Sequence, residues 1–374
     1  MATSEPIHYP NEPSRFEAKH IDDLLVFCHK MNASDITIQT DTPIFAEVYG
    51  HLQPITRRKL SNTEVSDLLN ALYGPNGTTQ IMRGEDLDTH YEIRPTRSER
   101  FRYRVNGTGC HVQGHEAVQI TIRTIPSDPP LLASLQLPPK IVEAIAPQEG
   151  VVYITGATGS GKSTLLAAII RELAEQPNSD RKILTYESPI EFVYDSLDTP
   201  TAVISQSEIP RNLASFAAGV RNALRRKPHL IMVGECRDTD TITALLEAAM
   251  TGHPVYTTLH TNGVPETVRR LVNSFPPEER RGRTIDIIET MRLVIWQRLV
   301  PAVDGTRVAL REYLVFTEEL RDELLASDPD NITAKTRDLM KRYGQPMEVD
   351  VEEKYKAGLI SERIYKILMA RSDR

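Results

Sequence analysis

One short segment constrains the fold of this chain more than any other. Residues 156–163, Gly-Ala-Thr-Gly-Ser-Gly-Lys-Ser, satisfy the pattern G-x4-G-K-[ST]. An apolar run, Val151 to Thr155, precedes the segment, and a stretch with helical periodicity, Ser163 to Ala174, follows it. A strand, a glycine-rich loop and a helix in that order are typical of a phosphate-binding loop. The sequence therefore predicts an α/β domain that binds ATP or GTP.

Each residue type in the loop has a chemical reason to be there. Glycines let the backbone fold so that several N–H groups point at phosphate oxygens. The helix that begins at Lys162 adds a partial positive charge, and the lysine can reach the β- and γ-phosphates. The Ser163 hydroxyl suits Mg²⁺. We expect ATP to be contacted along this segment by Gly156, Ala157, Thr158, Gly159, Ser160, Gly161, Lys162, Ser163 and Thr164.

The apolar pattern divides the chain into regions. After the loop, continuous apolar runs alternate with helical stretches, which predicts an α/β domain with a parallel sheet over residues 140–317. Short runs of alternating polarity over residues 21–127 predict a smaller α+β domain. Five prolines lie between Pro126 and Pro139, so we expect a linker at 128–139. Residues 1–20 are expected to form a flexible arm, and 318–374 a helical region.

Composition narrows the class of protein. A chain of 374 residues is long enough for two or three domains. The net charge of −7 disfavours a protein that coats nucleic acid. Three cysteines without a C-x-x-C spacing indicate neither a disulfide framework nor a zinc site. Because no run of 18 apolar residues occurs, we expect a cytoplasmic protein that could still attach peripherally to a membrane complex.

Acidic and histidine side chains follow three of the expected strands. Glu235 comes after the strand that ends at Val233, where it could orient the attacking water, although the usual magnesium aspartate of the strand tip is absent. Glu187 and Glu191 follow another strand; they fit either the same crevice or an exposed acidic loop. His260 ends a third strand; it could contact the γ-phosphate or serve as a structural histidine, and His253 is a weaker candidate.

These pieces together resemble the ATPases of type II and type IV secretion systems, which include pilus-retraction ATPases. Glu187-Ser188-Pro189-Ile190-Glu191 is similar to the Asp box of that family, Gly234 to Asp238 to its atypical Walker B motif, and Thr251 to Thr261 to its His box. N-terminal segments also match, at residues 33–35, 102–106 and 122–126. The resemblance covers the chain from about Ala33 onward, and it implies a RecA-like P-loop ATPase domain preceded by a PAS-like N-terminal domain.

The resemblance implies roles at the matched positions. Glu235 would be the principal catalytic glutamate, and Glu187 and Glu191 would help to hold water and Mg²⁺. His260 would face the γ-phosphate, with His253 nearby.

The resemblance also implies how such a protein works. Arg102 and Arg104 of the N-terminal domain would reach over the nucleotide. Family members act as ring-shaped homohexamers, bound peripherally to the inner membrane through components of the secretion complex, and their moving N-terminal domains turn ATP hydrolysis into mechanical work.

Two departures from the family pattern matter. Ser188 stands where the family has aspartate, so a metal role of that aspartate does not transfer. Lys227-Pro228-His229 stands where pilus motors have Asp-Pro-Asp. The latter segment is more similar to the DotB branch of the family, the ATPases of Dot/Icm-type (type IVB) secretion systems and their conjugative-plasmid relatives.

Other functions stay open at this point. A pilus-retraction ATPase is the alternative among the enzymes, and a scaffold that binds ATP with little hydrolysis is the alternative outside them. A nucleic-acid motor is a third option, because Arg225-Arg226-Lys227 and Arg280 to Arg283 are dense basic clusters. Clusters of this size are more often a solvated face or a contact between subunits.

Overall fold

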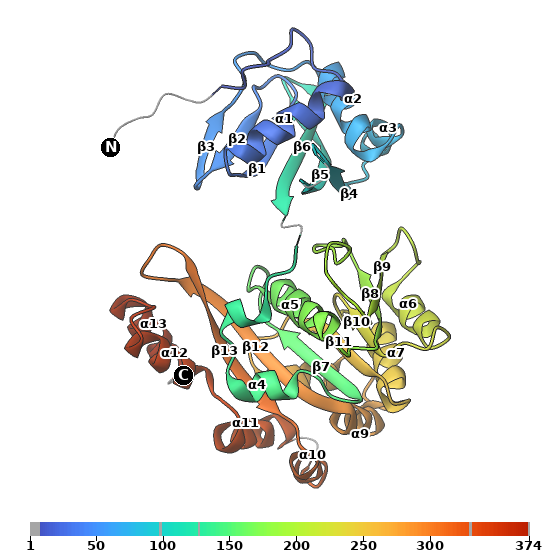
Figure 1. Cartoon of the computed structure of the whole chain (residues 1–374), viewed down its shortest axis with the longest axis vertical. Coiled ribbons are helices and arrows are strands. Elements are labelled where there is room, and N and C mark those ends of the chain that lie inside the picture. The colour runs from blue at the N-terminus through green and yellow to red at the C-terminus, as the bar shows by residue number, and fades with distance from the viewer. Residues whose placement is uncertain (1–7, 97–98, 126–127, 329–330, 373–374) are drawn as a thin grey trace. The chain divides into compact units, whose positions relative to one another are not determined.

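The computed structural model of the chain describes residues 8–96, 99–125, 128–328 and 331–372. The chain forms two compact units, Met1–Ser127 and Asp128–Arg374, each with its own sheet (Figure 1). The first unit has an antiparallel sheet and the second a mostly parallel one, followed by C-terminal helices. The predicted fold class is confirmed.

The first unit is a twisted antiparallel sheet with helices packed on it. The strand order is β3-β2-β1-β6-β5-β4. Helix α1 buries Ile21, Leu24, Leu25 and Cys28, spaced three and four residues apart as on one face of a helix. The elements are η1 (Ala18–His20), α1 (Ile21–Lys30), β1 (Ala33–Gln39), β2 (Phe45–Val48), β3 (His51–Pro54), α2 (Asn62–Tyr73), α3 (Gly77–Ile81), β4 (Leu87–Ile93), β5 (Phe101–Val112) and β6 (His115–Ile125).

The expectation of a flexible arm over residues 1–20 is wrong for its described part, residues 8–20. Tyr9 and Phe16 are buried in the core of the first unit. The backbone N–H of Phe16 donates to Glu64 Oε1 at 2.7 Å, and that of Tyr9 donates to the Ile55 carbonyl at 2.8 Å. Two buried aromatic side chains and these hydrogen bonds hold a segment whose polar composition suggested an arm. Residues 1–7 lie outside the described residues.

The second unit has a seven-stranded sheet in the order β13-β12-β7-β11-β10-β8-β9. Its neighbours pair in parallel except β12 and β13, which form an antiparallel hairpin at one edge. The elements up to the hairpin are η2 (Leu132–Leu135), α4 (Pro139–Ala144), β7 (Gly150–Thr155), α5 (Lys162–Glu175), β8 (Lys182–Glu187), β9 (Val203–Glu208), α6 (Phe216–Ala223), β10 (Leu230–Val233), α7 (Thr239–Met250), β11 (Pro254–Leu259), α8 (Val264–Asn273), α9 (Arg280–Thr290), β12 (Met291–Pro301) and β13 (Arg307–Val315).

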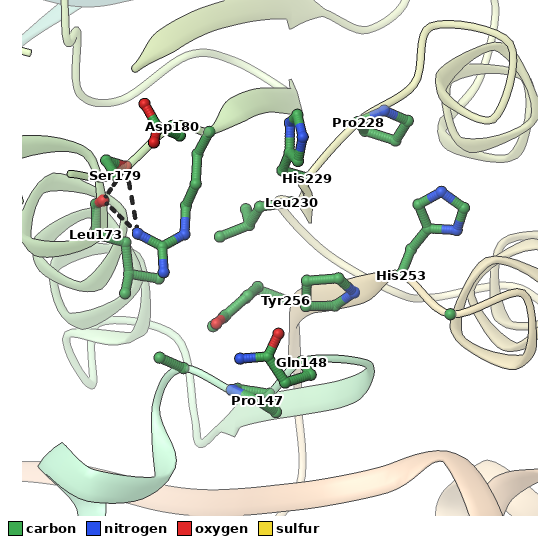
Figure 2. A pocket seen from close by; sticks show the side chains of 14 residues that line it. Pro147, Gln148, Leu173, Ser179, Asp180, Pro228, His229, Leu230, His253 and Tyr256 are labelled. Atoms are coloured by element: carbon green, nitrogen blue, oxygen red, sulfur yellow. Dashed lines mark hydrogen bonds between the residues drawn. The ribbon is translucent and has the colours of Figure 1, made fainter. Parts of the chain in front are cut away.

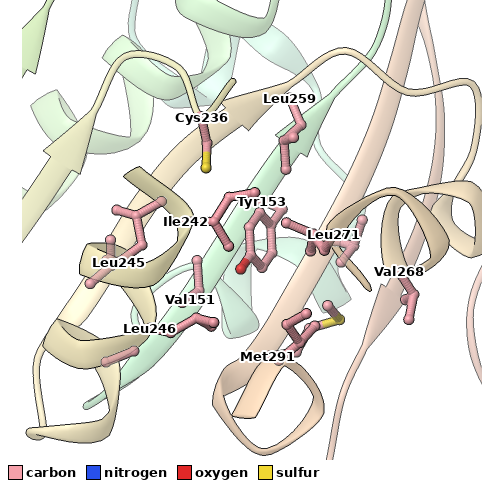
Figure 3. Close-up of a cluster of buried hydrophobic side chains, with 14 of the residues drawn as sticks. Val151, Tyr153, Cys236, Ile242, Leu245, Leu246, Leu259, Val268, Leu271 and Met291 are labelled. Atoms are coloured by element: carbon pink, nitrogen blue, oxygen red, sulfur yellow. The ribbon is translucent and has the colours of Figure 1, made fainter. Parts of the chain in front are cut away.

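The central strand β7 supplies the cores on both faces of this sheet. Every residue of β7 is buried. Val151 and Tyr153 point into the core under α6 to α9, whereas Val152 and Ile154 point into the core under α5. Figure 3 shows Tyr153 among side chains of α7 and α8. A strand buried on both faces reads as a continuous apolar run, which is why the sequence revealed it.

The proline-bearing segment 128–139 packs on the second unit at several of its residues. Leu132 is buried in the core under α5, and Arg171 Nη1 on α5 donates to the Pro129 carbonyl at 2.6 Å. The prolines prevented long regular structure, as expected, but the leucines between them are apolar enough to bind the segment to the domain.

The C-terminal helices extend the second unit. Helices α10 (Glu318–Leu325) and α11 (Ile332–Tyr343) pack against α8 and α9. Helices α12 (Met347–Lys356) and α13 (Glu362–Ser372) pack on the outer part of the β12–β13 hairpin through a small apolar cluster that includes Leu310 and Val351. Nowhere in the described part of the chain is a helix both long enough and apolar enough to span a bilayer.

Candidate nucleotide site

The phosphate loop connects β7 to α5, and its glycines adopt backbone angles that other residues avoid. Gly156, Gly159 and Gly161 have φ angles of 146°, 75° and 82°. A Cβ at Gly156 would lie 2.2 Å from the Gln297 carbonyl oxygen, so the backbone is also too close to β12 for a side chain. Ala157, Thr158 and Gly159 are exposed at the crest of the loop. This arrangement presents backbone to solvent where phosphates could approach.

Lys162 closes the loop from inside. Its ammonium group donates to the carbonyls of Gly156 at 3.0 Å and Ala157 at 2.8 Å. Burial lowers the pKa of Lys162, and the nearby carboxylates of Glu235 and Glu191 partly counter that shift. A buried ammonium whose hydrogen bonds go to two neutral carbonyls is a group that an anionic ligand would stabilise further.

The start of α5 offers a second feature that attracts anions. The N-cap residue is Gly161, so no side chain caps the first N–H groups of the helix. Ser163 is exposed and Thr164 half-buried in that first turn. Free N–H groups, the helix dipole and a hydroxyl at one point form a site for a phosphate chain.

Parallel register brings the candidate side chains to this same edge of the sheet. Leu259 of β11 pairs with Thr155 of β7, so His260 follows at the level where the phosphate loop begins. Val233 of β10 pairs with Thr257 of β11, so Glu235 lies at the same edge. The Thr258 hydroxyl donates to the Gly234 carbonyl at 2.6 Å, which fixes the turn that carries Glu235.

Glu235 lies beside an arginine and a histidine. Arg237 Nε lies 2.7 Å from Glu235 Oε2, and His260 Nε2 lies 4.0 Å from the same oxygen. Burial, helped by the positive charges of Lys162, Arg237 and Arg270, lowers the pKa of His260. His260 is therefore neutral at pH 7, with one ring nitrogen that donates a proton and one that accepts.

Glu187 and Glu191 both belong to the second unit near this edge. Glu187 is buried at the end of β8, where Oε1 accepts from Thr185 Oγ1 at 2.7 Å and Gln206 Nε2 at 3.1 Å. Glu191 is half-buried. Among the described residues no three His, Cys, Asp or Glu side chains cluster as ligands of a metal ion. Mg²⁺ that arrives with a nucleotide needs few protein ligands, because phosphate oxygens and water complete its shell.

The position of His253 contradicts the expectation that it lies near the nucleotide. His253 immediately precedes β11, whereas His260 immediately follows it, so β11 separates the two residues by about 20 Å. Together with His229 and Tyr256, His253 lines a cavity of about 360 Å³ where the parallel strands begin, at the opposite end of the strands from the phosphate loop (Figure 2). Two histidines of one motif were separated by the rise of an extended strand.

Arg102 and Arg104 lie on β5 of the first unit. Arg102 is buried and its Nε lies 3.8 Å from Glu92 Oε2. Arg104 Nη2 lies 2.5 Å from Asp88 Oδ2. Each arginine thus has a carboxylate neighbour on β4 within its own unit.

A buried chain of hydrogen-bonded polar residues lies behind the phosphate loop, and none of its residues beyond the loop belongs to a motif identified in the sequence. Gln297 Nε2 donates to the Ser160 carbonyl at 2.7 Å, and Arg311 Nε donates to Gln297 Oε1 at 2.9 Å. The backbone N–H of Arg311 donates to Asp350 Oδ2 of α12 at 2.7 Å. A glutamine inside the apolar run of β12 was the signal that could have revealed this chain.

Glu312 supports the loop after His260 in a similar way. One carboxylate oxygen accepts from the Val264 backbone N–H at 2.7 Å, at the start of α8. Burial raises the pKa of Glu312 to about 7; the bond from Val264 opposes the shift, and the charges of Glu266 and Glu348 add to it. The segment that bears His260 is thereby attached to β13.

Comparison with known proteins agrees with this geometry. Residues 93–344 match the family described as type II/IV secretion system protein. The chain is similar to the structure of the ATPase DotB of Legionella pneumophila, with 65% identity, a TM-score of 0.91 and coverage of 98% of this chain and 99% of that one.

Two pilus motors are also similar. The type IV pilus retraction ATPase PilT of Pseudomonas aeruginosa is 34% identical over 302 residues, which is 81% of this chain and 84% of PilT. A structure of the pilus retraction motor PilT with bound ADP is 28% identical, with a TM-score of 0.80 and coverage of 92% of this chain and 95% of that one.

Proposed function

The chain belongs to the family of type II/IV secretion system proteins, and from this membership we propose that it is a Mg²⁺-dependent homohexameric ATPase that powers a type IVB (Dot/Icm-like) secretion or conjugation apparatus. ATPase activity itself follows from the relatives, because these are ATPases and their matches cover most of the chain. One observation supports the site best: Glu235 and His260 follow strands that end beside the phosphate loop. A general base or water-orienting carboxylate has to lie there for hydrolysis.

The proposed chemistry assigns a step to each side chain. The N–H groups of the loop bind the phosphates of MgATP. The Ser163 hydroxyl and the Glu187 carboxylate would help to hold Mg²⁺. The ammonium of Lys162 turns from the two loop carbonyls to the β- and γ-phosphates, since charged oxygens are stronger acceptors. Glu235 orients the water that attacks the γ-phosphate, and Glu191 assists. Neutral His260 donates a hydrogen bond to the γ-phosphate.

Glu235 has to leave Arg237 for this role, and the cost of doing so is small. The Arg237 side chain is 68% exposed. The Glu235 side chain is 19% exposed, but its partner lies largely in solvent, and ion pairs at the surface contribute about 0–1 kcal/mol, so the nucleotide and its water can displace the arginine. The observed pair is compatible with a catalytic glutamate.

The coupling to mechanical work is proposed from the family. In a homohexamer, Arg102 and Arg104 would reach over the nucleotide and change position with its state. The protein would work in the cytoplasm, recruited peripherally to the inner membrane by components of the secretion complex. Nucleic acid is not expected as a partner, because the net charge is −7.

The type IVB assignment depends on two observations. Lys227-Pro228-His229 departs from the Asp-Pro-Asp of pilus motors. The chain is also 65% identical to the ATPase DotB of Legionella pneumophila, but 34% identical to PilT of Pseudomonas aeruginosa. A type IV pilus retraction ATPase is the alternative, supported by the coverage of the PilT match.

The decisive test is phosphate release from ATP and Mg²⁺, measured in parallel with particle size by light scattering. We expect a hexamer-sized particle that turns over ATP, and a rate lower by about 10²–10⁴ in Glu235→Gln. The matched control is Glu247→Gln, an exposed glutamate on α7, which should keep the rate of the wild type. ATP binding without turnover in a ring of the wild type would indicate a nucleotide-gated scaffold instead. A strong, salt-sensitive stimulation by DNA would indicate a nucleic-acid motor.

A further inference from the structure

The loop that binds phosphate is held from behind by a residue that belongs to no nucleotide-binding motif. We propose that Gln297 is a positioning residue for the phosphate loop, and that Arg311 and Asp350 connect it to helix α12, so that docking of α12 sets the affinity for nucleotide. The inference deepens the proposed function, on which it rests, because it identifies what controls the same site.

The orientation of the Gln297 amide is fixed by its two partners. Arg311 has only donors, so Gln297 has to present Oε1 to Arg311 Nε. The amide nitrogen then has to face the Ser160 carbonyl, which only accepts. Glutamine meets both requirements. Glutamate would accept from Arg311 but would present a second oxygen to the carbonyl of Ser160.

Gln297 contacts both ends of the loop. A Cβ at Gly156 would lie 2.2 Å from the Gln297 carbonyl, and a Cβ at Gly161 would lie 2.9 Å from Gln297 Nε2. The backbone of Gln297 therefore limits where the loop leaves β7, and its side chain limits where the loop enters α5. Between those two contacts lie the N–H groups that phosphate needs.

The connection continues to the C-terminal helices through β13. Arg311 pairs with Gln297 across the β12–β13 hairpin. Because β13 is an edge strand, the outward N–H of Arg311 would lack a partner without Asp350, which lies in α12. Val351 of α12 and Leu310 of β13 belong to one buried apolar cluster, which joins the same helix to the same strand. Displacement of α12 would thus remove the acceptor of the Arg311 N–H, and Arg311 is the residue of β13 that pairs with Gln297.

Because its residues are buried, this series of hydrogen bonds from Ser160 to Asp350 is sensitive to the loss of any one residue. Ser160, Gln297, Arg311 and Asp350 are 4%, 3%, 4% and 3% exposed. Water cannot easily replace a lost partner at such positions, so neighbouring groups have to move instead. A change at Asp350 should therefore reach the phosphate loop, although Asp350 belongs to a helix outside the nucleotide-binding sheet.

The first test measures ADP affinity by calorimetry on the full-length protein in Mg²⁺. Gln297→Glu should weaken ADP binding by about 10-fold or more, because a buried acceptor then faces the Ser160 carbonyl. In turnover, KM for ATP should rise by the same factor while kcat changes little, since the backbone N–H groups of the loop hold phosphate oxygens in substrate and transition state alike. Gln148→Glu, an exposed glutamine on the segment before β7, is the matched control and should bind like the wild type. Wild-type affinity and KM in Gln297→Glu would overturn the proposal.

The second test addresses the connection to α12 and remains decisive if Gln297→Glu does not fold. Asp350→Ala removes the acceptor of the Arg311 N–H and should weaken ADP binding about threefold or more. Asp350→Asn keeps an acceptor oxygen and should restore most of the affinity. The double variant Gln297→Glu/Asp350→Ala should bind no more weakly than Gln297→Glu, because the two residues act in one chain. Equal losses in Asp350→Ala and Asp350→Asn, or losses that multiply in the double variant, would refute the connection.

A failure of the proposed function is recognisable separately. Wild-type protein that binds ADP and releases no phosphate would contradict the ATPase role, while the ADP affinities of the variants would still decide whether Gln297 positions the loop.

Discussion

Replacing Lys162 with glutamine should affect nucleotide binding and the stability of the free protein very differently. In the free protein the ammonium is buried on two carbonyls, and burial lowers its pKa, so the protein around it disfavours the charge. Removing that charge relieves desolvation, while the lost hydrogen bonds cost about 1 kcal/mol each, of which the amide of glutamine recovers part. We expect the free energy of unfolding to fall by about 1 kcal/mol or less.

Nucleotide binding should suffer much more. Hydrogen bonds to charged groups contribute about 1.5–3 kcal/mol each, and a lysine ammonium can contact oxygens of both the β- and γ-phosphates. A loss of about 3 kcal/mol corresponds to an affinity lower by about 100-fold. ATP turnover should fall below detection, because the same contacts neutralise the charge that develops on the transferred phosphoryl group.

Calorimetric titration with ATP in Mg²⁺, together with urea unfolding of the free protein, measures both quantities. The matched control is Lys182→Gln at the start of β8, whose ammonium also donates to a backbone carbonyl, that of Arg226 at 3.1 Å. Lys182 lies at the opposite edge of the sheet, so this variant should bind ATP like the wild type. A Lys162→Gln protein that binds ATP normally, or one destabilised by several kcal/mol, would refute the reasoning.

Three further results follow from the site and its surroundings. His260→Ala should lower kcat by about 10–100-fold and leave ADP affinity nearly unchanged; because the His260 pKa is lowered, wild-type turnover should also stay constant as pH falls to about 6.5. His253→Ala should turn over ATP at the wild-type rate, since the residue lies at the end of the strands opposite the phosphate loop. A loss of activity comparable to that of His260→Ala would show that His253 does act at the nucleotide site. Glu312 has a folded-state pKa of about 7 against an ordinary 4.5, so the stability it contributes below pH 4.5 is lost as pH rises through 7. Urea unfolding should therefore show Glu312→Gln gaining on the order of 2 kcal/mol relative to the wild type between pH 4.5 and 8, and a constant difference would contradict the raised pKa.

Much of the fold was predictable because the strands of the second unit are buried on both faces. Val151 to Thr155 reads as a continuous apolar run for that reason, and the glycine loop after it identifies the nucleotide edge. Where strands are parallel, their carboxyl ends share an edge, so Glu235 and His260 could be placed together without coordinates. The polar segment 8–20 was misjudged because its two buried side chains, Tyr9 and Phe16, are too few to form a periodic apolar pattern.

His253 shows a different kind of error. A motif names residues that occur together, whereas an extended strand of six residues between two of them spans about 20 Å. The separation of His253 and His260 could have been worked out from the length of the expected strand. The match to the family motif suggested instead that both histidines lie near the nucleotide. The structure corrects the placement because β11 starts after one histidine and ends before the other.

By itself, the sequence determined that this chain binds nucleotide phosphates, because the loop, its lysine and the helix that follows are contiguous and local geometry suffices to build them. It also determined the edge at which the catalytic candidates gather, through the direction of parallel strands. Only the tertiary structure decided what holds the loop in place. Gln297 and Ser160 are 137 residues apart in the chain, and Arg311 and Asp350 are 39 apart. A hydrogen bond between distant segments depends on strand order and register, which arise from packing of the whole domain and leave no local pattern in the sequence.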